Sequence, residues 1–196
     1  MKVLIACEYS GTVRDAFLKR GHDAYSCDTQ PTLTNPSRHL QQDVTPLLNE
    51  GWDLLIAHPP CTHLAVSGAR WFSKKQKEQA LALDFVRTLL AAPIPKICLE
   101  NPISIISTRI RKPDQIIQPY QFGHPESKRT CLWLQGLPNL TPTDEVSPPR
   151  YREDGKPQWD NQTPTGQNKL GPSPERAMIR ARTYPGIAEA MARQWG

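Results

Sequence analysis

The fold is indicated most clearly by nine residues, Asp53-Leu-Leu-Ile-Ala-His-Pro-Pro-Cys61. The apolar run at 54–57 is typical of a buried parallel strand. The loop that follows contains two prolines, which fix its backbone, and then a cysteine. The stretch therefore predicts a thiol held just past the end of a buried strand.

Similar patterns recur along the chain, where short apolar runs alternate with segments of helical periodicity. Strands are predicted at 2–7, 23–27, 53–57, 96–100 and 130–134, and helices at 11–20, 73–91 and 185–194. This alternation predicts an α/β fold with a doubly wound, mostly parallel sheet. Ligands of such sheets bind beyond the carboxyl ends of the strands, so the polar residues at those ends are the candidates for function.

A chain of 196 residues suits a single domain over 1–196. Twenty prolines are present, many of them between Pro113 and Pro174, which predicts a second half rich in loops. Residues 136–172 have no clear period, and we expect an irregular, Pro-rich insert there. The lysines Lys74, Lys75 and Lys77 crowd the start of the helix predicted at 73–91 and hint at an anionic partner.

The five cysteines form no CxxC pair, which argues for free thiols in a reducing compartment and against a structural zinc site. No apolar run is long enough to span a membrane, and the N-terminal run is too short for a signal peptide. We therefore expect a cytoplasmic protein, in the host cytoplasm if it is encoded by a phage. The net charge of +5 permits a polyanionic partner.

Two strand ends carry groups that suit chemistry on a pyrimidine. Cys61 follows one strand, and Glu100-Asn101-Pro102 ends the next. Carbon 5 of a pyrimidine is a poor nucleophile until a thiolate adds at carbon 6, and that addition is easier when an acid acts on ring nitrogen 3. A buried carboxyl with a raised pKa would supply that acid, and Glu100 is the candidate.

These segments resemble the motifs of the DNA cytosine-5 methyltransferases, especially the compact versions common in phage genomes. Pro59-Pro60-Cys61 resembles the nucleophile motif of that family, and Glu100-Asn101-Pro102 resembles its Glu-Asn-Val motif. Three later segments follow in the family's order: residues 122–129, 173–176 and 184–192. The resemblance spans nearly the whole chain and implies the fold of the S-adenosylmethionine-dependent methyltransferases.

The resemblance implies that the cofactor is S-adenosylmethionine and that the partner is DNA, double- or single-stranded, with the target base outside the stack. The implied catalytic residues are Cys61, Glu100, Asn101 and Arg129. Glu8 is a predicted cofactor ligand because it ends a strand, and the resemblance implies Ser10, Gly11, Asp28, Asp43 and Pro59 as further cofactor ligands. The predicted nucleic-acid contacts are His63, Ser67, Arg70, Trp71 and Lys128.

The chain also departs from the family pattern. The Gly-rich cofactor loop keeps only Gly11, with Arg14 nearby, and His58 replaces a small residue before the prolines. Thr130 aligns with the family's second arginine, so that Arg129 is one place off. Only about 136–172 stands where the family has its target-recognition domain. We therefore predict relaxed or very short sequence recognition, or a protein partner or homodimer that supplies it.

Several alternatives stay open at this stage. The same fold would also suit RNA, a free nucleotide or modified DNA as substrate, and a catalytically idle nucleic-acid-binding protein is the alternative from another class. Asp28 and Asp43 are also common turn residues, and Trp71 is also explained by local packing. His58 and His63 flank the thiol and either tune its pKa or have no role.

Overall fold

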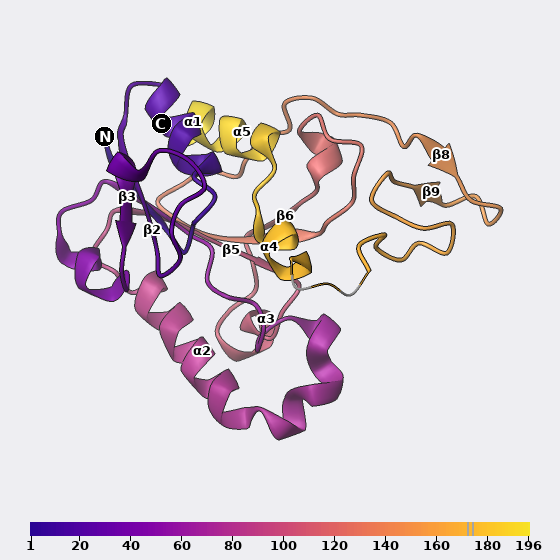
Figure 1. The fold of residues 1–196 in the computed structure, drawn as a ribbon, viewed down its shortest axis with the longest axis horizontal. Coiled ribbons are helices and arrows are strands. Elements are labelled where there is room, and N and C mark those ends of the chain that lie inside the picture. The colour runs from indigo at the N-terminus through magenta and orange to yellow at the C-terminus, as the bar shows by residue number, and fades with distance from the viewer. Residues whose placement is uncertain (172, 174) are drawn as a thin grey trace.

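The computed structural model describes residues 1–171, 173 and 175–196 as an α/β protein built on a seven-stranded sheet (Figure 1). The strand order is β3-β2-β1-β4-β5-β7-β6. The first five of these strands are mutually parallel, and β7 runs antiparallel to β5 and to β6. This is the doubly wound, mostly parallel sheet that the sequence predicts. Within the described residues, no helix combines the length and apolarity needed to cross a bilayer.

The strands are short and lie close to their predicted positions. They are β1 (Lys2–Ala6), β2 (Asp23–Asp28), β3 (His39–Gln41), β4 (Leu54–Ala57), β5 (Lys96–Pro102), β6 (Gln115–Ile117) and β7 (Thr130–Gln135). The sequence pattern predicts no strand at the positions of β3 and β6. Each of these has three residues and lies at an edge of the sheet, so neither carries the buried apolar run by which the inner strands are recognised.

The core has two layers because successive side chains of a strand point to opposite faces of the sheet. In β1, Val3 and Ile5 face one cluster, and Leu4 and Ala6 face the other. The first cluster is closed by α1 (Thr12–Lys19) and α5 (Pro185–Trp195), which pack side by side (Figure 1). The second is closed by α2 (Gln76–Leu90) and the 3-10 helix η2 (Thr45–Asn49).

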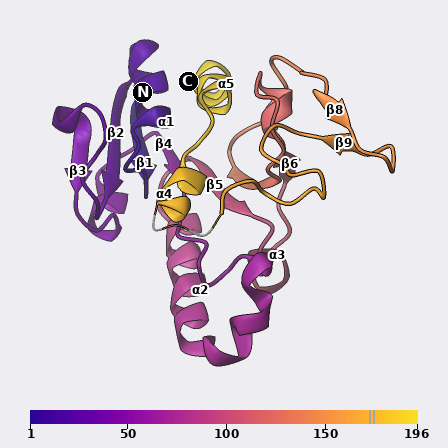
Figure 2. The ribbon, with the colours of Figure 1, turned by 45° about the vertical axis from the view of Figure 1, so that its right-hand side comes forward.

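The prediction of a helix from residue 73 is wrong at its start. Residues 66–74 form a separate 3-10 helix, η3 (Val66–Lys74), and α2 begins only at Gln76. Lys74 and Lys75 therefore precede α2, and only Lys77 lies in its first turn. Figure 2 shows η3 joining α2 at the end of α2 that is farthest from the sheet, with the short α3 (Ile106–Arg109) nearer the sheet. The basic residues of this segment are thus presented on an arm of the molecule.

Between β7 and α5 the described residues are irregular apart from three short elements: β8 (Arg150–Tyr151), β9 (Pro157–Gln158) and α4 (Arg176–Ala181). The two strands pair as a small hairpin away from the main sheet (Figure 2). Two prolines of the predicted motifs, Pro172 at the end of the insert and Pro174 in the segment 173–176, lie outside the described residues.

Candidate active site at the carboxyl edge of the sheet

Strand pairing brings the predicted catalytic segments to one edge of the sheet. β4 and β5 are parallel neighbours, with Ala57 opposite Leu99, so the residues that follow each strand face each other. His58 Nδ1 lies 2.7 Å from Glu100 Oε2. Asn101 Nδ2 donates to the carbonyl of Pro59 at 2.8 Å, and its side chain is buried. These two contacts join the cysteine loop to the end of β5.

Cys61 is partly exposed, in contrast to the buried thiols Cys27, Cys98 and Cys131. Burial of the sulfur raises the pKa of the Cys61 thiol, and the negative charge of Glu100 raises it further. The positive charges of Lys128 and Arg180 oppose this shift without reversing it. The charge of the Glu100 carboxylate therefore acts on the Cys61 thiol. Because the pKa of the thiol is raised, Cys61 is protonated at neutral pH.

The carboxyl of Glu100 is largely buried, with a side-chain exposure of 12%. Burial alone raises its pKa, but the hydrogen bond from His58 and the charges of His58 and Lys128 outweigh burial, so the pKa is lowered. The prediction of a raised pKa for Glu100 is therefore wrong. The reason is His58, which the sequence analysis noted as a departure but did not pair with Glu100.

Of the two basic residues predicted near the site, Lys128 lies beside Glu100 and Arg129 does not. Lys128 lines a small cavity together with Glu100, Thr130 and Tyr184, and its charge acts on both Glu100 and Cys61. Arg129 is exposed and is absent from that lining. In strict register the family's arginine falls on Thr130, and the structure shows the side chain of Thr130 buried at this point.

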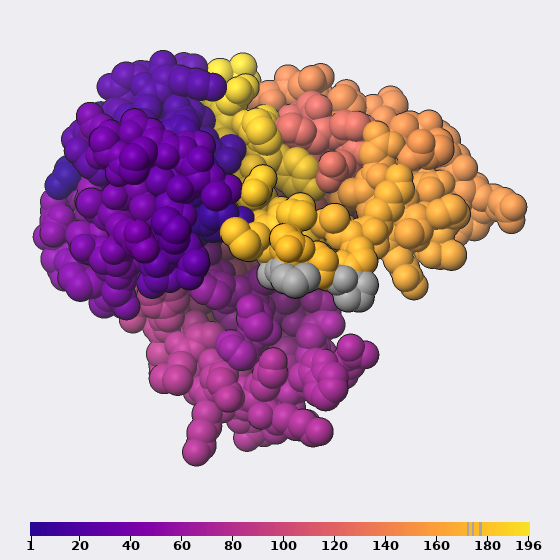
Figure 3. All heavy atoms as spheres, in the orientation of Figure 1, coloured from indigo at the N-terminus to yellow at the C-terminus, as the bar shows by residue number. Residues whose placement is uncertain are grey.

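The space in front of Glu100 is small. Its cavity measures about 10 Å³, which is at the lower limit for one water molecule. The segment around α4 lies over this region: Tyr9 Oη donates to the carbonyl of Met178 at 2.5 Å, and Lys128 Nζ donates to the carbonyl of Arg180 at 2.9 Å. Figure 3 shows the segment on the surface between the N-terminal part and the orange part of the chain. A pyrimidine ring enters only if this segment or Tyr184 moves.

A larger cavity, of about 210 Å³, lies at the carboxyl ends of β1 and β2. It brings together Asp28 and Asp43, two of the predicted cofactor ligands. One oxygen of Asp28 accepts the N–H of Gln30 at 2.9 Å, and one oxygen of Asp43 accepts the N–H of Thr45 at 2.7 Å. Each carboxylate therefore keeps a second oxygen for a ligand. The hydrogen bond from Thr45 also lowers the pKa of Asp43.

The remaining walls of this cavity are mostly apolar or weakly polar. They are formed by Cys7, Cys27, Thr29, Gln42, Val44, Pro60 and Phe85. Pro60 stands here in place of the predicted Pro59, which is buried and whose carbonyl is engaged by Asn101. Apolar walls with two carboxylates suit a nucleoside, whose flat base needs apolar faces and whose hydroxyl and amino groups donate to carboxylates. The residues thus fit the adenosine part of S-adenosylmethionine.

Cys7 is a cavity residue that the sequence analysis treated as inert. Its backbone has φ of 58°, the left-handed region in which non-glycine residues are rare. Burial, followed by the charge of Asp28, raises the pKa of its thiol to about 12. Cys7 is therefore a neutral group that fills the wall of the cavity. No pattern in the sequence distinguishes it from a core cysteine.

Three predicted cofactor ligands, Glu8, Ser10 and Gly11, are absent from the lining of this cavity. Glu8 is buried and turns toward α1, where its carboxyl accepts the N–H groups of Val13 at 2.6 Å and Arg14 at 3.2 Å. Burial raises the pKa of Glu8, while the charge of His58 and these N–H groups work against it. In this structure the carboxyl of Glu8 pairs the backbone N–H groups in the first turn of α1, which have no partner within the helix.

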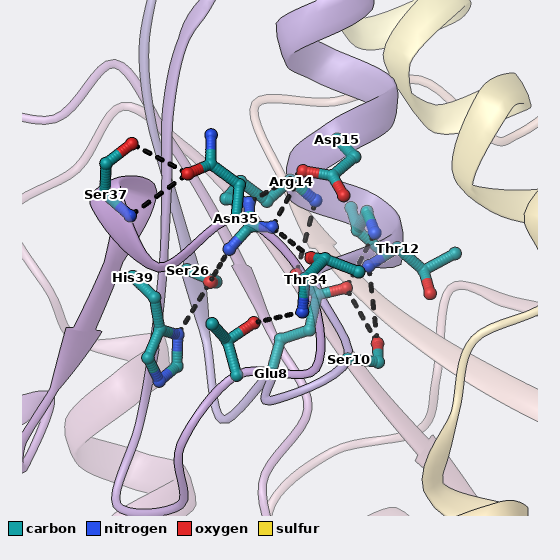
Figure 4. Close-up of polar contacts among 12 residues, drawn as sticks. Glu8, Ser10, Thr12, Arg14, Asp15, Ser26, Thr34, Asn35, Ser37 and His39 are labelled. Carbon is teal, nitrogen blue, oxygen red and sulfur yellow. Dashed lines mark hydrogen bonds and ion pairs between the residues drawn. The ribbon is translucent and has the colours of Figure 1, made fainter.

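Arg14 fills the space beside the shortened cofactor loop. It is fully buried, and its guanidinium donates to Asp15 at 2.9 Å, to Ser26 at 3.0 Å and to Thr34 (Figure 4). Ser26 is bonded in turn to His39 Nδ1 at 2.8 Å. The guanidinium therefore ties the chain after β2 to α1, and its donors are used within the fold.

Gly11 makes this arrangement possible and gives a stability test. Its φ is +74°, and a Cβ there would collide with the Thr34 hydroxyl and the Arg14 guanidinium. We expect Gly11→Ala to lower the free energy of unfolding by roughly 2–4 kcal/mol, from backbone strain and displacement of a buried charge. Urea unfolding followed by circular dichroism measures this change.

Gly21→Ala is the matched control, because Gly21 has φ of +83° with open space around its Cβ position. It carries the backbone strain alone and is expected to cost about 1 kcal/mol. Equal losses in the two variants would contradict the role given to the Arg14 contacts.

Four of the five predicted nucleic-acid residues lie on the segment that follows Cys61, and the fifth is Lys128 beside Glu100. Ser67, Arg70 and Trp71 are exposed on η3. The side chain of Trp71 is 47% exposed, and Arg70 and Lys74 lie over its ring at 5.2 and 5.8 Å. His63 is less exposed, and its Nδ1 is buried without a hydrogen-bond partner in the described structure. The arrangement offers an aromatic surface flanked by cations next to the thiol loop.

Comparison with known proteins adds a likeness of fold. No protein-family model matches the chain, and a search of curated proteins found no match. Among solved structures, a similar chain is a protein of E. coli described as a DNA modification methyltransferase encoded within a prophage. The two are 16% identical, with a TM-score of 0.47 over 74% of this chain and 51% of the other. The present chain thus spans about half the length of that protein, and the likeness carries no information on substrate or mechanism.

Proposed function

We propose that this protein transfers a methyl group from S-adenosylmethionine to carbon 5 of cytosine in DNA, through a covalent adduct between Cys61 and carbon 6 of the base. The observation that carries the proposal is that a partly exposed thiol and a buried carboxylate follow or end the neighbouring strands β4 and β5, with the charge of the carboxylate acting on the thiol. The cavity that holds Asp28 and Asp43 lies at the same edge of the sheet.

Each residue at this edge has a role in the proposal. Cys61 adds to carbon 6 as the thiolate, which gives carbon 5 the electron density it lacks in the free base. Glu100 binds the edge of the base at nitrogen 3. Asn101 holds the cysteine loop through Pro59. Lys128 stabilises the negative charge that develops on the thiolate and on the ring.

The cofactor is held in the proposal by Asp28 and Asp43, with the apolar walls of the cavity against its adenine ring. When bound, S-adenosylmethionine supplies an electrophilic methyl group. The cavity of about 210 Å³ is smaller than the roughly 300–1,000 Å³ of pockets that enclose drug-sized ligands. It therefore accounts for the nucleoside end of the cofactor.

DNA is the proposed partner because the charges of Lys128 and Arg180 act on the thiol and η3, which follows the thiol loop, carries further cations. Arg70 and Trp71 on η3 provide a phosphate contact and a stacking surface. The insert contributes one small hairpin, with Tyr151 67% exposed. Sequence readout normally needs an element that reaches base edges in a groove. We therefore propose short or relaxed sequence recognition, or recognition supplied by a partner chain.

The direct test is mass spectrometry of nucleosides after incubation of the purified protein with S-adenosylmethionine. Duplex DNA, single-stranded DNA, tRNA and dCMP serve as parallel substrates. The proposal requires 5-methyl-2′-deoxycytidine from one of the DNA samples. Methylation of tRNA or dCMP alone would show that the substrate is RNA or a free nucleotide and not DNA. The absence of methyl transfer to all four, together with no binding of S-adenosylmethionine in calorimetry, would refute the proposal.

The cofactor site gives a separate prediction. We expect Asp28→Asn and Asp43→Asn each to weaken S-adenosylmethionine binding by roughly 10–100-fold, because each loses a charged acceptor worth about 1.5–3 kcal/mol. Isothermal titration calorimetry measures the change. Asp84→Asn, on the exposed face of α2, is the matched control and should bind like the wild type. Unchanged affinity in both cavity variants would show that S-adenosylmethionine does not bind in this cavity.

A further inference from the structure

The contact between His58 and Glu100 determines whether Glu100 can donate a hydrogen bond to a base or accept one from it. The two side chains are 8% and 12% exposed, and the Nδ1–Oε2 distance is 2.7 Å. In a site this dry, the position of the shared proton decides whether Glu100 donates or accepts hydrogen bonds. Recognition at ring nitrogen 3 depends on that choice, because cytosine presents a lone pair there and uracil presents an N–H.

The second nitrogen of His58 indicates where the proton lies. Nε2 is buried and has no hydrogen-bond partner among the described residues. If Glu100 donated its proton to Nδ1, the ring proton would be on Nε2, and a buried N–H would be left unpaired. Such donors are rare in folded proteins and cost about 1–3 kcal/mol. With the proton on Nδ1, His58 donates and Glu100 accepts.

The surrounding charges support the ionised state of Glu100. Lys128, on the segment before β7, lowers the pKa of its carboxyl together with His58. The other titratable groups whose pKa responds to the charge of Glu100 are thiols: Cys61, Cys98 and Cys131. The remaining carboxyl near His58 is Glu8, whose oxygens are occupied by N–H groups of α1.

We infer that His58 is a positioning residue that holds Glu100 as a hydrogen-bond acceptor, so that the reacting base must present an N–H at ring position 3. A uracil ring in DNA already carries that proton. Cytosine takes up one proton from solvent at nitrogen 3 when it binds and returns it when the adduct breaks down. The site thus selects among pyrimidines by the proton at position 3, a specificity that rests on the proposed function.

The inference is tested with two oligonucleotides that differ only in a single deoxycytidine or deoxyuridine target. Both reactions require the thiolate of Cys61, so the effect of its ionisation cancels in the ratio of the two kcat/KM values. For the wild type we expect the cytosine-to-uracil ratio to fall as pH rises through neutrality, approaching about tenfold per pH unit.

In His58→Leu the Nδ1–H donor is lost, and burial then raises the pKa of Glu100. Glu100 can then donate to cytosine and it repels the N–H of uracil. We expect the ratio at neutral pH to rise by at least about tenfold. His22→Gln, at the opposite edge of the sheet beside Met1, is the control and should leave the ratio unchanged.

The outcomes separate the two proposals. If the wild type methylates neither oligonucleotide, the proposed function fails. If it methylates one or both and the ratio has the same pH dependence in wild type and His58→Leu, the inference alone fails. His58→Phe serves if His58→Leu does not fold. A titration of the Glu100 carboxyl in the wild-type protein by 13C NMR, assigned through Glu100→Gln, gives an independent readout, and a pKa above the ordinary glutamate range would also overturn the inference.

Discussion

Cys61→Ser is expected to abolish methyl transfer, with a loss of at least about 10³-fold in kcat, as for other enzymes that lose their nucleophile. A serine hydroxyl is far less ionised than a thiol, and it is a weaker nucleophile toward carbon 6. The same variant should form no covalent complex with DNA that contains 5-fluorocytosine, because the trapped species is the adduct itself. Denaturing gel electrophoresis of the complex and a radiolabelled methyl assay measure the two losses.

The pH dependence of adduct formation follows from the raised pKa of Cys61. Burial and the charge of Glu100 keep the thiol protonated at neutral pH, so the reactive thiolate is a minor species. The rate of trapping by 5-fluorocytosine DNA should therefore rise with pH across the neutral range. A rate that is flat or falls there would show that the thiol is already ionised and that the environment described here is incorrect.

Cys98→Ala is the matched control for these measurements. Cys98 is fully buried in the middle of β5, so its replacement costs some stability and leaves the thiol loop in place. It should keep the covalent complex and most of the activity. Full activity in Cys61→Ser, or loss of the complex in both variants, would contradict the role of Cys61 as nucleophile.

The framework of the fold is predictable from the sequence because its inner strands are buried on both faces. Such strands are short continuous apolar runs, as at Leu54–Ala57, and they stand out from the chain around them. The polar residues that follow them are then placed at one edge by topology alone. For this reason Cys61, Glu100 and Asn101 could be grouped before the structure was known. Asp28 also ends a predicted strand, whereas Asp43, which lines the same cavity, is implied only by the family resemblance.

Contacts between side chains are not predictable in this way. The pairing of His58 with Glu100 reverses the pKa shift expected from burial, and it depends on a register between β4 and β5 that the sequence does not specify. The sequence likewise presents Glu8 as a strand-end carboxylate, and only the turn into α1 shows that its oxygens are occupied by N–H groups. Local geometry after a strand decides whether a carboxylate serves the fold or a ligand.

The start of α2 illustrates a different limit. Residues 73–75 continue the helical periodicity, yet they belong to η3 or to the junction at Lys75. Periodicity measures which face is apolar, and a 3-10 helix followed by an α-helix gives nearly the same pattern over one turn. The start of η3 is held by backbone hydrogen bonds of Leu64 and Val66 with Ile105 and Ile103, contacts that periodicity does not reveal.

Glu100→Gln is expected to lower kcat by roughly 10²–10⁴-fold while leaving the affinity for S-adenosylmethionine unchanged, because the carboxyl acts on the base and not on the cofactor. The amide keeps the shape of the side chain, but it carries no charge to stabilise the N–H at position 3 of the ring. Single-turnover methyl transfer and calorimetry separate the two quantities. Loss of cofactor binding in this variant would indicate a general collapse of the sheet edge.

The same variant changes how stability depends on pH, and the sign distinguishes an ionised Glu100 from a neutral one. The pKa of Glu100 is lowered in the folded protein, so the carboxylate stabilises the fold above its unfolded pKa, and this contribution is lost as the pH falls through the folded pKa. Wild-type protein should therefore lose more stability on acidification than Glu100→Gln does. If acid destabilised the two proteins equally, or the variant more, Glu100 would carry a proton in the native state. His58 would then be the acceptor of the pair, and the site would match the lone pair of cytosine directly.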